Sequence, residues 1–178
     1  MSPALLTRMS ISWSPCASVA LLRVAQRARH ARDVAAVVAD LAARFSGVRV
    51  FLIGTSRGTV SAAYAGAVLG ARVSGVVLSS TIFNASRGGI GLAGFDYAST
   101  GSPLLFVHHV DDGCAVTPYE GAEKLSRTYP LISVKGGDAA QSDACDALSA
   151  HGYFGVEAPT VSAMSRWFFG RDFPTRVP

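Results

Sequence analysis

The chain of 178 residues is long enough for one folded domain with a substantial core, and its 49% hydrophobic and 16% charged residues exclude an intrinsically disordered protein. No run approaches the roughly 18 consecutive apolar residues that a membrane-spanning helix needs. The net charge of +4 reflects five arginines that precede the first acidic residue, Asp33; the rest of the chain carries 11 basic and 12 acidic residues. That remainder has no basic stripe or nucleic-acid motif, so we expect no binding to nucleic acid.

Residues 1–30 are the least informative segment. A positive residue, an apolar stretch and several small residues loosely resemble a signal peptide, but three serines and Pro15 interrupt the apolar stretch. The alternatives are a poorly matching cleaved signal and an irregular or misassigned N-terminus. We therefore treat residues 1–30 as a segment of uncertain structure and residues 31–178 as the folded domain.

From residue 31 onward, helical and strand patterns alternate. Helices are predicted over residues 31–45, 59–69, 118–128 and 158–169. Strands are predicted over residues 49–53, 73–78, 104–108 and 131–134. Thr117 is expected to cap the third helix, because Pro118 and Glu120 follow it as in many helix N-termini. This alternation predicts an α/β fold, with a mostly parallel sheet and helices on both of its faces.

The first predicted strand leads directly into a G-x-S-x-G sequence with Ser56 at its centre. Gly54 and Gly58 flank the turn, and an alanine-rich helical pattern starts at Thr59. A tight turn from strand to helix strains its central residue, and we expect glycines there because larger side chains would collide. The pattern alone is common by chance, but between a strand and a helix it favours a nucleophile elbow with Ser56 exposed at the helix N-terminus.

Two further loops carry residues that serine chemistry needs. Asp111 and Asp112 follow the third predicted strand, and His151 lies in the loop before the last helix. In a parallel sheet, the loops that leave the carboxyl ends of the strands share one edge. Acyl transfer through a serine requires a base to take the hydroxyl proton and a carboxylate to orient that base. Taken singly, the aspartates could merely end a strand, and His151 could cap the last helix.

The combination resembles an α/β-hydrolase, over about residues 31–170. Gly54 to Gly58 matches the family's nucleophile elbow, His108 to Asp112 occupies the place of its H-G-x-x-D sequence, and His151-Gly152 lies just before the last helix, as in that family. The resemblance implies a serine hydrolase that acts on an ester or related acyl bond of a small molecule. It implies no metal or other cofactor.

By that resemblance, Ser56 would be the nucleophile, Asp112 the acid and His151 the base. The backbone N–H of Arg57 would be one donor to the oxyanion. Asp111 remains the alternative acid, one residue from the matched position. The loop over residues 86–103 is expected to border the acyl pocket, although its sequence does not indicate a particular substrate.

Cys114 and Cys145 lie near the acid and the base in the sequence. A disulfide between them would tie the two loops together and would indicate an oxidising compartment, periplasmic or extracellular. The alternative is a pair of buried thiols in a cytoplasmic enzyme. Cys16 would remain free in either case.

An α/β-hydrolase of ordinary length would have further strands before the elbow, and residues 1–30 offer no convincing match to them or to an H-G-G oxyanion motif. We therefore expect the strand over 49–53 to lie at a sheet edge, where a second copy of the chain could pair with it. The alternatives to an active hydrolase are a truncated or inactive α/β-hydrolase homologue and a non-catalytic interaction domain that uses this edge.

Overall fold

The computed structural model describes residues 15–178, with side chains from residue 29 onward. Its first element is helix α1, Pro15–Arg44, which is much longer than the helix predicted over 31–45 and includes half of the segment whose structure we left uncertain. The signal-like interpretation of the N-terminus rests on residues 1–22, of which residues 1–14 lie outside the described residues and residues 15–22 belong to α1.

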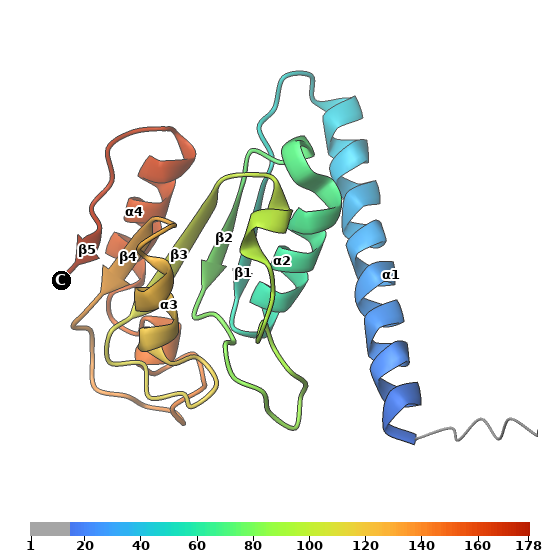
Figure 1. The fold of residues 1–178 in the computed structure, drawn as a ribbon. Coiled ribbons are helices and arrows are strands. Elements are labelled where there is room, and N and C mark those ends of the chain that lie inside the picture. Colours follow the sequence, from blue (N-terminus) through green and yellow to red (C-terminus); the bar gives the residue numbers. More distant parts are fainter. Residues whose placement is uncertain (1–14) are drawn as a thin grey trace, which may run out of the picture.

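The centre of the fold is a parallel sheet of five strands in the order β1-β2-β3-β4-β5 (Figure 1). The strands are β1 (Phe51–Thr55), β2 (Gly75–Ser79), β3 (Leu104–His109), β4 (Leu131–Val134) and β5 (Arg176–Val177). All neighbouring strands pair in parallel. The expectation of an α/β fold is thereby confirmed. The sequence did not indicate β5, which contributes only two residues at the outer edge next to β4.

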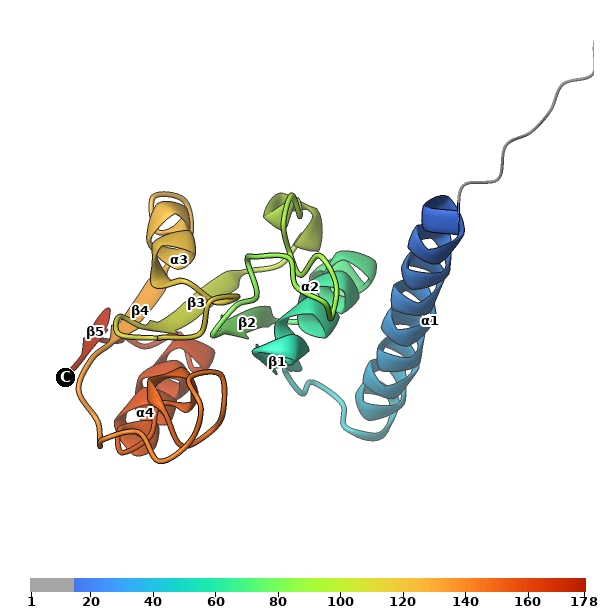
Figure 2. The same cartoon turned by 90° about the horizontal axis from the view of Figure 1, so that it is seen from below.

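Helices cover both faces of the sheet, as Figure 2 shows in a view from below. α2 (Arg57–Leu69) and α3 (Tyr119–Leu125) lie on one face, and α4 (Glu157–Phe168) lies on the other. α1 packs against α2, beyond the β1 edge of the sheet. Alternate residues of the central strands serve the two layers: Val76 and Leu78 pack in the cluster that includes Ala63 of α2, whereas Val77 packs with Ala163 of α4. This alternation follows from the two-residue period of a strand, and burial on both faces accounts for the continuous apolar runs.

Strand β1 lies at one edge of the sheet, as predicted, because within residues 15–178 β2 is the one strand that pairs with it. Ile53 on this strand is 54% exposed. An apolar stripe also remains exposed near the end of α1, since Val37 and Phe45 are more than half exposed while Val38 is buried towards α2. None of the helices within the described part of the chain is sufficiently long and apolar to cross a membrane.

Candidate functional site

Ser56 lies in the turn between β1 and α2, with a backbone φ of 51° and ψ of −118°. Only a few non-glycine residues adopt a positive φ, and those that do are often held at functional sites by the surrounding structure. Here the Ser56 N–H donates to the carbonyl of Ser79 at 2.9 Å, and the Ser56 carbonyl accepts from Thr59 Oγ1 at 2.6 Å. These bonds fix the turn on both sides of the serine. Arg57 is the first residue of α2, so its N–H is among those that have no partner within the helix.

The two glycines of the turn have different roles. A Cβ atom on Gly54 would lie 2.7 Å from the backbone nitrogen of Thr59 and even closer to the carbonyl group of Gly58. A Cβ atom on Gly58 would meet nothing within 4 Å. The expectation that both positions exclude a side chain is therefore correct for Gly54 and wrong for Gly58, because residue 58 already lies on the outer side of the first turn of α2.

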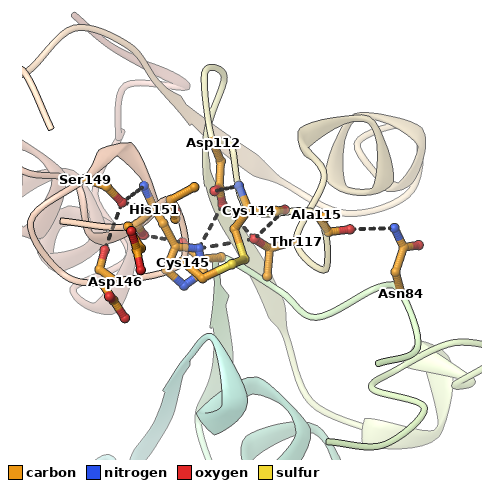
Figure 3. Close-up of a disulfide and its surroundings, with 12 residues drawn as sticks. Asn84, Asp112, Cys114, Ala115, Thr117, Cys145, Asp146, Ser149 and His151 are labelled. Atoms are coloured by element: carbon orange, nitrogen blue, oxygen red, sulfur yellow. Dashed lines mark hydrogen bonds and ion pairs between the residues drawn. A yellow bond between two sulfur atoms is a disulfide. The ribbon is translucent and has the colours of Figure 1, made fainter. Parts of the chain in front are cut away.

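Asp112 and His151 form a buried pair between the loops that follow β3 and β4 (Figure 3). His151 Nδ1 lies 3.1 Å from Asp112 Oδ2, and the two side chains are 4% and 0% exposed. A carboxylate oxygen only accepts hydrogen bonds, so the geometry places the imidazole proton on Nδ1 and leaves Nε2 as the basic nitrogen. Nε2 is buried and has no hydrogen-bond partner.

Asp111, the alternative acid, does not reach His151. It is exposed, and its backbone N–H donates to Nδ1 of His109 at 3.1 Å. Asp112 instead turns into the protein, where its Oδ1 accepts the Cys114 N–H at 2.9 Å. The structure thus brings Asp112, and not Asp111, to the histidine.

A disulfide joins Cys114 to Cys145 and connects the two loops that carry Asp112 and His151 (Figure 3). The bond predicted as one of two alternatives is therefore present. Cys114 is buried, whereas Cys145 is exposed in a loop that is exposed along almost all of residues 135–148. A short 3-10 helix, Ala150–Gly152, follows this loop and carries the histidine.

Residues at the end of β2 hold the backbone of His151. Ser80 Oγ donates to the carbonyl of His151 at 2.8 Å and also lies 3.0 Å from the Tyr153 hydroxyl. Tyr153 in turn donates to the carbonyl of Val107, and burial raises the pKa of Tyr153 to about 12. Both Ser80 and Tyr153 have positive φ, a costly conformation for residues other than glycine. Ser79, which accepts from Ser56, directly precedes Ser80, so the serine turn and the histidine are both hydrogen-bonded to the same strand end.

Sequence patterns did not indicate Ser80, Tyr153 or Thr117 as parts of this site. Thr117 was expected to cap α3, but the N-cap residue is Pro118, without a side-chain hydrogen bond. The Thr117 hydroxyl instead donates to Asp112 Oδ2 at 2.8 Å. Ser80 directly follows an apolar strand that lies next to the strand leading to Ser56. This position is the one feature of the sequence that could have indicated Ser80 as part of the site.

His108 is fully buried beside the site and stays neutral. Its Nε2 accepts the Thr81 N–H at 2.8 Å, which leaves the proton on Nδ1, a buried atom without a partner. Burial lowers the pKa of His108 to about 3, with a smaller opposing contribution from the negative charge of Asp112. Because protonation would break the bond to Thr81, His108 is suited to holding the end of β2 and not to carrying protons.

Comparison with known proteins found no family model that matches this chain and no match among the curated proteins.

Proposed function

We propose that this protein is a serine hydrolase of the α/β-hydrolase type that acts on an ester or related acyl bond of a small molecule through an acyl-enzyme. The observation that carries the proposal is the buried Asp112–His151 pair, whose Nε2 has no partner, together with Ser56 in a strained turn hydrogen-bonded to the same end of β2. This arrangement of roles matches the general requirements of serine acyl transfer.

In the proposed reaction, Ser56 Oγ attacks the acyl carbon while His151 Nε2 takes the hydroxyl proton. Asp112 holds the imidazole in the required tautomer and stabilises the imidazolium that forms. The Arg57 N–H at the start of α2 donates to the oxyanion, with support from the positive end of the helix dipole. His151 then returns the proton to the leaving group, and water releases the acyl group from Ser56 by the same steps.

The disulfide supports an oxidising compartment for this enzyme, such as the periplasm or the extracellular space, because such bonds seldom persist in a reducing cytoplasm. The loop over residues 86–103 approaches the side chain of Arg57, since a Cβ atom on Gly88 would lie 3.2 Å from the Arg57 guanidinium. This contact places the glycine-rich loop beside the residue that follows the proposed nucleophile.

A fluorophosphonate probe tests the proposal. We expect the folded protein to be labelled on Ser56, and we expect Ser56→Ala and His151→Ala to abolish labelling because they remove the nucleophile and its base. Ser126→Ala is the matched control, since this exposed serine at the end of α3 only donates to a nearby backbone carbonyl. A folded wild-type protein that stays unlabelled would contradict the proposal and favour an inactive homologue.

A second candidate function is an interaction domain that pairs with another copy through the β1 edge. The observation that favours it is the exposed edge strand itself, with Ile53 half exposed and the apolar stripe of α1 also uncovered. An edge strand presents unpaired backbone donors and acceptors to any further strand. Size-exclusion chromatography with light scattering should then show a dimer that Ile53→Lys dissociates, whereas a stable monomer at high concentration would exclude this pairing.

A further inference from the structure

Thr117 lies at the centre of the candidate site without belonging to the proposed triad. Its side chain is completely buried, and its Oγ1 lies 2.8 Å from Asp112 Oδ2 and 3.1 Å from His151 Nδ1. Since Nδ1 also lies 3.1 Å from the same carboxylate oxygen, the three atoms form a nearly regular triangle.

The protons of this triangle can be assigned from the hydrogen-bonding capacity of each group. The carboxylate only accepts, so both of its neighbours must donate to Oδ2: Thr117 gives its single hydroxyl proton, and His151 gives the Nδ1 proton. The hydroxyl then has its lone pairs free, and one faces Nδ1 at 3.1 Å. The Nδ1–H is therefore shared between the carboxylate and the threonine oxygen.

The same hydroxyl completes the fixation of Asp112. One carboxylate oxygen accepts the Cys114 N–H, and the other accepts Thr117 and His151. With a separate donor on each oxygen, the carboxylate keeps its orientation while the imidazole gains or loses a proton at Nε2. If the hydroxyl were absent, His151 would be the one remaining donor to Oδ2 among the described contacts.

We propose that Thr117 is a positioning residue of the hydrolase, which fixes the Asp112 carboxylate and the plane of the His151 ring through its hydroxyl group. This inference rests on the proposed function, and it adds a fourth residue to the machinery that places the base. The hydroxyl does not cap α3, because the N-cap residue of that helix is Pro118.

Two variants separate the hydroxyl from the packing of the side chain. Thr117→Val keeps the branched shape and removes the hydroxyl, whereas Thr117→Ser keeps the hydroxyl and removes the methyl group. We expect Val to lower kcat by about 10-fold or more with little change in KM, because the base is misplaced and substrate binding is untouched. Ser should restore most of kcat.

A matched control is Thr160→Val, which removes another buried threonine hydroxyl, bonded to the Val156 carbonyl in α4 away from the site. Its kcat should equal that of the wild type. The proposal is refuted if Thr117→Val turns over like the wild type, or if Ser is as impaired as Val, since packing alone would then account for the residue.

A measurement without substrate keeps this inference distinct from the proposed function. In protein with 15N-labelled histidine, the NMR signal of the His151 Nδ1–H should be protected from exchange in the wild type and in Thr117→Ser, and broadened in Thr117→Val. If the wild type fails to label or to turn over but this pattern appears, the hydrolase proposal is lost while the positioning by Thr117 stands. Equal Nδ1–H protection in all three proteins would overturn the positioning itself.

Discussion

Removal of the Cys114–Cys145 disulfide should destabilise the protein and disturb the candidate site together. The two cysteines are separated by 31 positions in the sequence. In the chain-entropy account, a cross-link that closes a loop of this length stabilises the fold by about 3 to 4 kcal/mol at 25 °C. That amount is a large part of the total stability of an ordinary domain, which is about 5–15 kcal/mol.

The double variant Cys114→Ala/Cys145→Ala measures this effect, because alanine introduces no new polar group at the buried position 114. Urea unfolding followed by circular dichroism, without reductant, should show the free energy of unfolding reduced by about 3 to 4 kcal/mol. Ser126→Ala, an exposed position away from the disulfide, should unfold like the wild type. A loss below about 1 kcal/mol would refute the reasoning and would mean that the two loops are held together in the unfolded state by other means.

The same variant should also lose labelling by a fluorophosphonate under conditions where it is still folded. The disulfide ties the segment whose N–H orients Asp112 to the loop that leads to His151, and its loss releases both from each other. Labelling at the wild-type rate in the folded double variant would show that the remaining contacts, from Thr117 and Ser80, suffice to place the base.

Two further predictions concern the turn and the buried histidine. Gly54→Ala should destabilise the protein by about 1–3 kcal/mol in urea unfolding, since its Cβ atom meets backbone, whereas Gly58→Ala should be tolerated; equal effects would contradict the turn geometry. Burial lowers the pKa of His108 from 6.5 to about 3, so as the pH falls the unfolded chain binds a proton at His108 before the folded protein does. The contribution of His108 to the free energy of unfolding is therefore fully present above about pH 6.5, and it decreases by up to about 1.4 kcal/mol per pH unit as the pH falls towards 3. In His108→Gln, the free energy of unfolding should depend less on pH over this range.

The sequence predicted the order of the main elements because each strand is an apolar run with clear turn residues around it. β4 has the predicted bounds, and the predicted bounds of the other strands near the site differ from the structure by two residues or fewer. Parallel pairing follows from the alternation of strands and helices, and with it the position of Ser56, Asp112 and His151 in loops at the same edge of the sheet. The structure pairs Asp112 with His151, whereas His151 Nε2 has no hydrogen bond to Ser56. β5 was missed because two residues produce no periodic pattern.

Side-chain roles were less predictable because they depend on contacts between distant segments. Thr117 has the local sequence of a helix cap, yet its hydroxyl bonds to Asp112, because α3 begins one residue later than expected. Val161 lies at a position that the apolar spacing of the last helix favours for the core, yet it is 55% exposed. Such outcomes require the tertiary structure.

The placement of His151 shows most clearly why the candidate site depends on tertiary contacts. The histidine follows a long exposed loop that contributes little to either core cluster, so local structure alone would leave it poorly defined. Its ring is held by Asp112 and Thr117, its carbonyl by Ser80, and its loop by the disulfide. Asp112, Thr117 and Ser80 all lie in segments that follow β2 or β3. The central strands of the sheet therefore determine the position of the His151 ring. The order of the candidate site therefore depends on the stability of the sheet, and substitutions that weaken the β2–β3 core should impair the proposed acyl transfer before they unfold the chain.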